Sequence, residues 1–415
     1  MSPSAVPANS HAGEPDLNLT EQAIEHRTNG TAEANGTSNI TNGVHTKALP
    51  RLDASKLTYS FTKAPREIPA PGVTSEDGNS ICTDHMICVP WKAKSGWGTP
   101  ELKPYGPLSL MPTASVLHYA TECFEGMKAY RGHDGKLRLF RPDCNAERML
   151  MSSVRISLPA FEPSELERLV LALMARPGTF IYLRPTMIGT QAALGVQAPS
   201  EALLYVIASY MPVMDNPVGG MRLHTSPNDM VRAWVGGFGY AKVGANYGPS
   251  LLATQEARER GFGQILWLYG EEGYCTEAGA SNFFVVWKDK ATGKTQVVTA
   301  PLDDRLILDG VTRRSVLQLI RERLGDEVEV VERKYTIGEV MEADSEGRLL
   351  ECFASGTAYF VMPISLIHHR GQDLPFPMGK AGEGGPVTLK VKGWLKDIMY
   401  GGEQHPWGVV VPEEQ

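Results

Sequence analysis

The sequence is poor in cysteine and has no Cys-x-x-Cys pair. Among its 415 residues, the six cysteines are scattered over positions 82, 88, 123, 144, 275 and 352. Structural zinc sites use closely spaced pairs, and disulfide-stabilised secreted domains are short and rich in cysteine. The scatter argues against both classes, so we expect no metal site. We expect reduced intracellular thiols, buried as small apolar side chains.

Long apolar runs, an excess of positive charge and the common nucleotide-binding motifs are also lacking. No run of about 18 apolar residues occurs, so we expect no segment that spans a membrane. The formal net charge of −7 disfavours a nucleic-acid partner and a polybasic membrane patch. None of the glycine-rich segments resembles a Gly-x-Gly-x-x-Gly or Walker motif, which disfavours dinucleotides and nucleoside triphosphates.

The first 50 residues have almost no aromatic side chains and are rich in Ser, Asn, Thr, Ala and Gly. Such a segment buries too little apolar surface to offset its ordering entropy, so residues 1–50 are predicted to form a disordered tail. Mitochondrial transit peptides are rich in arginine and poor in acids, whereas this tail carries Glu14, Asp16, Glu21, Glu25 and Glu33. We therefore expect a cytosolic protein, with a mitochondrial location as the alternative.

The remaining chain alternates short β-like runs with amphipathic helical patterns, which predicts a mixed α/β fold. Its length favours more than one domain. Residues 211–228 are rich in Pro, Gly and Asn and are interpreted as an interdomain linker. This places a small α/β domain at 51–210 and a large α/β domain at 229–415. Ligands commonly bind at such a junction.

Individual elements follow from hydrophobic periodicity and capping signals. Strands are predicted at 136–140, 179–189, 202–209, 264–270, 281–287 and 327–333, in the segment around Lys242, and in a run that ends in ASGTA at 354–358. Helices are predicted at 145–156, 249–260, 309–324 and 387–399. Another helix is expected after a capping box formed by Ser164 and Glu167.

The most unusual stretch is GGFGYAKVGANYG, residues 236–248, in which five glycines surround Lys242 and Tyr247 follows. Glycine in an ordered element costs about 0.5–1 kcal/mol relative to alanine, so this segment needs space or unusual backbone angles. A desolvated lysine forms a Schiff base with a carbonyl group of a substrate or of pyridoxal phosphate. The glycines would let a flat ring approach the backbone. The alternative is a solvated lysine in a flexible loop.

Other segments fit the remaining needs of such a cofactor. LDGVTRR (308–314) and ASGTA (354–358) can present backbone N–H groups to a phosphate. Glu277, in a small-residue turn before a strand, could keep a pyridine nitrogen protonated. Each feature alone is weak evidence and is more commonly an ordinary turn. Together with Lys242 they favour a pyridoxal phosphate site.

Eight sequence blocks, read in order, resemble the class IV (fold-type IV) pyridoxal-phosphate aminotransferases, and among them the eukaryotic branched-chain amino acid aminotransferases. The blocks are LHYATECFEGMKAYRG, LRLFRPDCNAERM, YLRPTMIGTQAALGV, RAWVGGFGYAKVGANYGPSL, QILWLYG, TEAGASNFFVVW, LDGVTRR and SGTA. The resemblance implies a two-domain, D-amino acid aminotransferase-like fold with pyridoxal 5'-phosphate between the domains, in a homodimer. It also implies ping-pong transamination between Leu, Ile or Val and 2-oxoglutarate.

The resemblance further implies roles for residues around the cofactor. Lys242 matches the lysine that forms the internal aldimine and then moves a proton to and from the substrate α-carbon. Tyr247 matches the tyrosine at the phenolic oxygen of the cofactor, and Glu277 matches the acid at the ring nitrogen. The phosphate would be held by side chains and backbone groups of Arg148, Val311, Thr312 and Thr357.

For the substrate, the resemblance implies an apolar slot with polar groups at one end for the α-carboxylate. The matching positions are Tyr119, Phe124, Tyr182, Arg184, Gln264, Thr357 and Ala358. Leu194 and Val196 resemble residues that the neighbouring subunit contributes to the pocket. A slot of this kind discriminates by about 1–3 kcal/mol per methylene, so Leu, Ile and Val should all enter.

Three positions depart from the family pattern. Tyr359 and Met362 stand where mammalian relatives have a redox Cys-x-x-Cys, Ala245 replaces a glycine, and Met214 lies near the place of a pocket tyrosine. The last change leaves open a paralogue with a shifted substrate, such as an enzyme of secondary metabolism. A D-amino acid aminotransferase, an aminodeoxychorismate-lyase-like enzyme and a catalytically silent binding protein also stay open.

Overall fold

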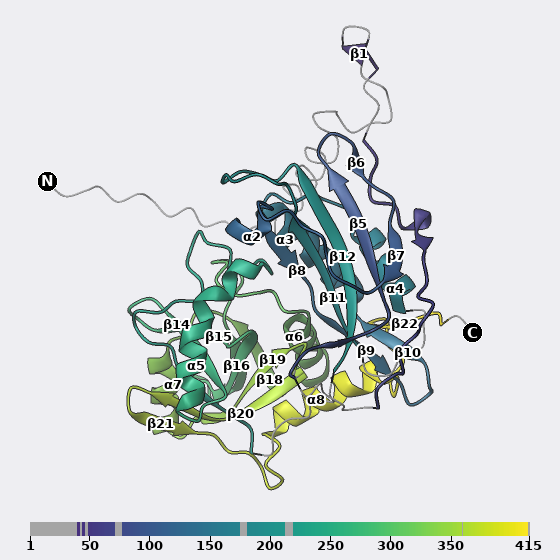
Figure 1. The fold of residues 1–415 in the computed structure, drawn as a ribbon. Helices are drawn as coiled ribbons and strands as arrows, with labels where there is room; N and C mark the ends of the chain where they lie inside the picture. The colour runs from purple at the N-terminus through teal and green to yellow at the C-terminus, as the bar shows by residue number, and fades with distance from the viewer. Residues whose placement is uncertain are drawn as a thin grey trace, which may run out of the picture.

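Two large β-sheets form the framework of the structure, a computed structural model (Figure 1). The structure describes residues 49–70, 77–174, 181–211, 219–358 and 360–413, and the backbone of a short hairpin formed by β1 (Ile40–Thr41) and β2 (Val44–His45). Most of the predicted N-terminal tail, residues 212–218 of the predicted linker, Met214 and Tyr359 lie outside the described residues.

The first sheet has 11 strands within the described chain and is drawn mostly in blue and teal in Figure 1, with the C-terminal strand β22 in yellow. Its main path runs in the order β22-β10-β9-β11-β12-β5-β7-β3, and β4, β6 and β8 pair at its sides. The strands are β3 (Thr58–Tyr59), β4 (Ile81–Cys82), β5 (His85–Lys92), β6 (Gly96–Trp97), β7 (Glu101–Pro104), β8 (Glu122–Phe124), β9 (Met127–Arg131), β10 (Leu137–Phe140), β11 (Ile181–Gly189), β12 (Glu201–Tyr210) and β22 (Gly408–Val410).

Over the residues that the structure describes, the second sheet has nine strands, in the order β15-β14-β13-β20-β19-β16-β17-β18, with β21 paired to β20. It is mixed, because β13 runs parallel to β14 and β20 and β17 runs parallel to β18. The strands are β13 (Met221–Thr225), β14 (Gln264–Tyr269), β15 (Tyr274–Ala278), β16 (Ser281–Lys288), β17 (Thr295–Thr299), β18 (Val328–Glu332), β19 (Leu349–Gly356), β20 (Phe360–His369) and β21 (Gln372–Pro375).

Helices cover these sheets. α3 (Pro142–Arg155) and α4 (Pro163–Met174) share one apolar core with the first sheet, and α6 (Val311–Leu324) and α8 (Pro386–Met399) share another with the second. The second sheet also packs against α7 (Ile337–Ser345) and α5 (Leu251–Glu259). The short helices are α2 (Val116–Tyr119), η1 (Ala54–Lys56), η2 (Gly244–Asn246) and η3 (Gly248–Ser250). Among the described residues, no helix has the length and apolar character needed to cross a membrane.

The pattern of each strand matches the way in which it is covered. β16 carries the unbroken run Phe283–Trp287, all buried, because apolar cores lie on both faces of the central strand. In β12, buried positions alternate with half-buried ones, since mainly one face meets the core. The sequence-based prediction of a mixed α/β fold is therefore confirmed. The structure also has the predicted strand or helix in each predicted segment except the one around Lys242.

Three local predictions were wrong. Ser164 does not cap α4, because the helix already begins at Pro163, whose fixed φ suits a first turn. Lys242 lies in a loop rather than a strand; only Val243 forms an isolated bridge, to Cys123. Glu277 lies within β15 and not in the turn that follows it, so its backbone is fixed by pairing with Asn282.

The C-terminal end of the chain returns to the first sheet. β22 pairs with β10 at the sheet edge, and Val411 is buried in the core of that sheet (Figure 1). Apart from β22, the chain passes from the first sheet to the second only once, between β12 and β13, which lie on either side of residues 212–218. The predicted large domain, 229–415, thus contains a strand that belongs to the sheet of the predicted small domain.

This return of the chain can be tested at Val411, whose side chain is 3% exposed. Val411→Ala should lower the free energy of unfolding by about 2 kcal/mol, because it removes buried carbon atoms and leaves a cavity. Val410→Ala is the matched control: its side chain is 45% exposed on the neighbouring position. It should change stability by less than about 0.5 kcal/mol in urea unfolding. Equal losses at both positions would contradict the assignment of Val411 to the core.

Candidate active site

A cavity of about 560 Å³ lies between the elements of the two sheets. The first half of the chain contributes residues from β8, α3 and β11, and the second half contributes the Lys242 loop, β15, the start of α6 and the end of β19. The lining residues are Glu122, Phe124, Gly126, Arg148, Tyr182, Arg184, Lys242, Gly244, Tyr247, Glu277, Ala280, Asn282, Leu308, Gly310, Val311, Thr312, Ser355, Gly356, Thr357 and Ala358.

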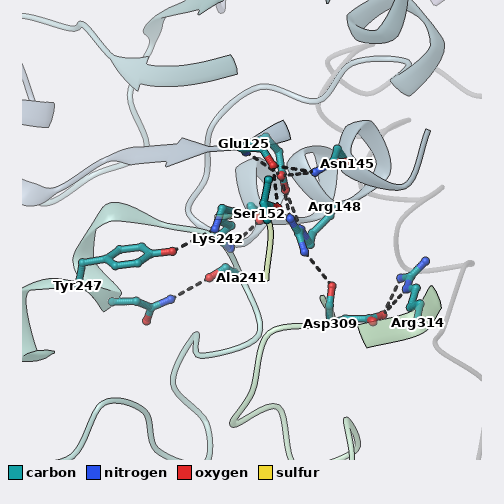
Figure 2. A network of polar contacts seen from close by, with 12 residues as sticks. Glu125, Asn145, Arg148, Ser152, Ala241, Lys242, Tyr247, Asp309 and Arg314 are labelled. Carbon is teal, nitrogen blue, oxygen red and sulfur yellow. Dashed lines mark hydrogen bonds and ion pairs between the residues drawn. The ribbon is translucent and has the colours of Figure 1, made fainter. Parts of the chain in front are cut away.

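Lys242 points its amine into this cavity from a backbone that is fixed on both sides. Its N–H donates to Ser152 Oγ of α3 at 2.8 Å, and its carbonyl accepts from the N–H of Phe124 at 3.1 Å. The Nζ atom lies 3.2 Å from Tyr247 Oη (Figure 2). It also lies 5.0 Å from the centre of the Phe124 ring. The amine therefore lies next to the rings of Phe124 and Tyr247 on a backbone that α3 and β8 hold in place, and it is not a solvated lysine in a flexible loop.

Each of the four glycines of the lining, Gly126, Gly244, Gly310 and Gly356, stands where a Cβ atom would collide with a neighbouring side chain. A Cβ atom at Gly244 would lie 2.8 Å from the Glu122 carboxylate, and one at Gly310 would collide with Asn282 Oδ1. Side chains at either position would push polar groups of the wall out of place. Within the glycine-rich segment 236–248, the prediction that glycine makes room in the site is thus supported at Gly244, whereas Gly236 and Gly248 have open space around them.

Arg148 lies in a buried ion pair that the sequence did not predict. Its Nε and Nη2 atoms donate to Glu125 at 2.7 and 2.8 Å, and Nη1 donates to the carbonyl of Asp309 at 2.9 Å (Figure 2). Asn145 donates to the same carboxylate at 2.7 Å. Burial acts to raise the pKa of Glu125, but the Arg148 charge and these hydrogen bonds outweigh it and hold the pKa below its usual value. Glu125 therefore stays ionised and fixes the guanidinium in the cavity wall.

Glu277 has partners that fix both oxygens of its carboxylate. Oε2 lies 2.5 Å from Arg232 Nη2, whereas Oε1 accepts from the N–H of Leu308 at 3.0 Å and from the Asn282 amide at 3.4 Å. Burial raises the pKa of Glu277, and the Arg232 charge opposes this rise. The acid that the sequence singled out is thus buried in the cavity wall and paired. Arg232 itself went unnoticed in the sequence.

The start of α6 offers unpaired polar groups to the cavity. Its N-cap, Gly310, makes no side-chain cap, so the first N–H groups of the helix, those of Val311 and Thr312, have no partner within it. Thr357 Oγ1 is near them and donates to the Gly126 carbonyl at 3.3 Å. Ser355 Oγ is buried with no hydrogen-bond partner among the described residues. Such a wall suits an anionic group.

The predicted substrate residues divide into two groups. Phe124, Tyr182, Arg184 and Ala358 line the cavity, and Arg184 Nε is buried there without a hydrogen-bond partner in the described chain. Thr357 lines the cavity as well, whereas the other four lie outside the lining of a single chain: Gln264 on β14, and Tyr119, Leu194 and Val196, which are 37%, 66% and 90% exposed. Glu122 is a lining carboxylate that the sequence did not single out, and burial raises its pKa.

The described chain contains no cluster of three or more His, Cys, Asp or Glu side chains placed to bind a metal. All six cysteines are free and buried, which confirms the expectation of buried thiols.

Comparison with known proteins shows to which family the chain belongs. Residues 122–367 match the family model described as amino-transferase class IV, and the chain therefore belongs to the class IV aminotransferases. The matched stretch includes Arg148, Lys242, Tyr247 and Glu277.

Among curated relatives, the chain is similar to branched-chain-amino-acid aminotransferases over most of its length. It is 44% identical to the mitochondrial protein of Schizosaccharomyces pombe, covering 90% of each chain. It is 46% identical to the cytosolic protein of Saccharomyces cerevisiae, covering 88% of this chain and 99% of the relative. The cytosolic protein of Mus musculus is 44% identical over 80% of this chain and 86% of its own.

Solved structures show the same fold. The branched-chain aminotransferase of Thermoproteus uzoniensis with norvaline has a TM-score of 0.64 at 25% identity, covering 79% of this chain and 99% of its own. The T.th. branched-chain amino acid aminotransferase complexed with N-(5'-phosphopyridoxyl)-L-glutamate has a TM-score of 0.61 at 30% identity, covering 78% of this chain and 98% of its own.

The attachment of the Lys242 backbone to α3 can be tested with Ser152→Ala. The change leaves a buried N–H without a partner and should lower the free energy of unfolding by about 1–3 kcal/mol. Exchange of the Lys242 amide hydrogen, followed by mass spectrometry, should become faster. Ser153→Ala is the control, because the buried Ser153 hydroxyl donates only to the Leu150 carbonyl of its own helix. Unchanged exchange at Lys242 in Ser152→Ala would contradict the role of this hydrogen bond.

Proposed function

We propose that this aminotransferase transfers amino groups between branched-chain L-amino acids and 2-oxoglutarate, with pyridoxal 5'-phosphate as its cofactor. The observation that carries the proposal is the Lys242 amine in a cavity of about 560 Å³, next to Tyr247 and enclosed by residues of both sheets. The similarity to branched-chain-amino-acid aminotransferases over most of the chain supports the substrate class.

The residues present fit this cofactor in size and chemistry. The cavity volume lies within the range of small-ligand sites. The Lys242 amine suits the aldehyde of the cofactor, and the buried Glu277 carboxylate suits its ring nitrogen. The start of α6, whose first N–H groups have no partner within the helix, suits the phosphate. The buried Ser355 Oγ without a partner is also explained if an anion lies beside it. Arg148, Val311, Thr312 and Thr357 would hold the phosphate, and Lys242 would hold the aldehyde carbon.

Bound pyridoxal phosphate supplies an electron-accepting ring, which lowers the cost of removing the proton from the substrate α-carbon. The Lys242 amine takes this proton and returns it, as a general base and acid held in place by Ser152 and Phe124. Tyr247 Oη lies 3.2 Å from the amine and orients it. The Phe124 ring helps to exclude water. One amino acid leaves as its 2-oxo acid before the second oxo acid enters, in a ping-pong sequence.

For the substrate, we propose that Phe124 and the aliphatic part of the wall take the side chain and that Arg184 binds a carboxylate. The Arg184 guanidinium lies 4.6 Å from the centre of the Phe124 ring and donates to Tyr182 Oη at 2.9 Å, which leaves its Nε free for an acceptor. Tyr119, Gln264, Thr357 and Ala358 complete the proposed substrate set. A pocket that combines apolar surface with the Arg184 guanidinium can accept both leucine and glutamate.

We further propose a homodimer in which Leu194 and Val196 complete the pocket of the neighbouring subunit. Supporting this, Met111, Leu117, Leu194 and Val196 are all more than half exposed, at 62%, 57%, 66% and 90%. They lie near an isolated bridge between Ala114 and Ala192, which brings their two loops together. Exposed apolar side chains gathered in this way are typical of an interface. The proposed location is the cytosol, with the mitochondrion as the alternative, since the S. cerevisiae relatives include a cytosolic and a mitochondrial protein; imaging of the full chain with a C-terminal fluorescent tag would test it.

The central test uses Lys242→Ala in an assay that follows glutamate formed from L-leucine and 2-oxoglutarate. We expect turnover to fall by about 10³-fold or more with the circular dichroism spectrum unchanged, because the proton carrier is lost. Lys242→Arg keeps the charge beside Phe124 and Tyr247 but cannot give up its proton, so it should be equally inactive. Normal turnover in either variant, or activity of the wild type with D-alanine only, would count against the proposal.

The subunit interface can be tested with the double variant Leu194→Asp/Val196→Asp. Size-exclusion chromatography with light scattering should give twice the 45.3 kDa chain mass for the wild type and a shift toward the single chain for the variant. The reason is that two buried charges disfavour association. Leu389→Asp, at a position 40% exposed on α8, is the control and should remain dimeric. A monomeric wild type would rule out the interface.

A further inference from the structure

Arg232 contacts the carboxylate of Glu277 on the side that faces away from the cavity. It lies between β13 and the Lys242 loop, and its Nη2 atom is 2.5 Å from Glu277 Oε2. The side chains are 11% and 2% exposed, so water hardly screens this pair. Glu277 lines the cavity, but Arg232 does not. The guanidinium therefore acts on whatever occupies the cavity only through the carboxylate.

The second contact of Arg232 holds it in this position. Its Nη1 atom donates to the carbonyl of Leu306 at 3.3 Å, two residues before Leu308, whose N–H reaches the other oxygen of Glu277. One short segment, residues 306–308, thus fixes both partners of the ion pair. The carboxylate can neither rotate nor withdraw from the cavity wall without breaking the ion pair to Arg232 and the hydrogen bonds from Leu308 and Asn282.

The charges around Glu277 determine where a proton resides. A buried carboxylate tends to take up a proton, and burial does raise the pKa of Glu277. The groups that oppose this are Arg232 first, then the N–H of Leu308, and then the more distant charges of Lys242 and Arg148. Because Arg232 is the one cation in direct contact among the described residues, its removal should make Glu277 a markedly stronger base.

We propose that Arg232 is a positioning residue that keeps Glu277 ionised, so that a proton shared between this carboxylate and the cofactor's ring nitrogen stays on the nitrogen. This inference rests on the proposed function. With Arg232 in place, Glu277 is the weaker base and the nitrogen keeps the proton. Without it, the same proton moves to a carboxylate oxygen, the ring becomes neutral, and its capacity to accept electrons falls.

The direct measurement is the ¹⁵N chemical shift of ring-labelled pyridoxal phosphate bound to the enzyme. We expect the signal of a protonated pyridine nitrogen in the wild type and that of a neutral nitrogen in Arg232→Met. Cofactor affinity should fall by about tenfold or more in this variant, because the attraction between the protonated ring nitrogen and the Glu277 carboxylate is lost. A protonated nitrogen in Arg232→Met would overturn the inference.

Arg155→Met is the matched control, since Arg155 donates to the Gly237 carbonyl of the same glycine-rich segment but makes no contact with Glu277. It should retain the wild-type nitrogen signal. A neutral nitrogen in this control would overturn the inference, because it would show that any disturbance of the segment has the same effect. Arg232→Lys keeps a cation near Glu277 and reports even if Arg232→Met folds poorly. It should retain the protonated signal, and a neutral nitrogen there would also contradict the inference.

The double variant Arg232→Met/Glu277→Gln tests whether Arg232 acts through Glu277. In the Glu277→Gln background, loss of Arg232 should change cofactor affinity by less than about twofold, since no carboxylate remains to be held ionised. An equal loss in both backgrounds would overturn the inference. A wild-type enzyme that takes up no pyridoxal phosphate would instead refute the proposed function, which keeps the two failures apart.

Discussion

The site depends on the way in which the Lys242 backbone is held between the two halves of the chain. The lysine belongs to a loop that precedes η2 in the second half, yet its N–H and carbonyl are paired with Ser152 and Phe124 of the first half. The adjacent Val243 bridges to Cys123. Because these contacts are buried, the loop cannot move without exposing unpaired backbone groups, so it behaves like a regular element although it has no regular structure.

Buried charges around the cavity are arranged in pairs. Arg148 is paired with Glu125 and Arg232 with Glu277, and in each pair the carboxylate also accepts from an asparagine, Asn145 or Asn282. The penalty of burying an ion is offset only when such partners are present. The pairs therefore leave a site whose charged side chains are fixed before any ligand arrives, which is the condition for electrostatic preorganisation.

Much of the site could be predicted because its signals are local. Lys242 and Tyr247 are five positions apart, and the glycines around them have a steric reason at Gly244. The start of α6 and the strand that ends in SGTA were also recognised from short motifs, and each contributes to the cavity lining. The errors were local as well. A run of small residues around Lys242 was interpreted as a strand, because sequence alone does not show that its hydrogen bonds go to a helix and to another strand's end.

From the sequence by itself, the class of fold could be predicted, and so could Lys242, Glu277 and the start of α6 as parts of the site. Each of them is encoded by residue type and spacing within a short segment. Only the tertiary structure decided which charges meet. Glu125, Arg232 and Asn282 carry no motif that marks them as site residues, and the ion-pair partners of Glu125 and Arg232 are distant in the chain. The physical reason is that ion pairing depends on distance and burial, which chain packing sets and periodicity does not. In the same way, β22 returns to the first sheet because β10 offers an unpaired edge there, and that edge exists only once the sheet has formed.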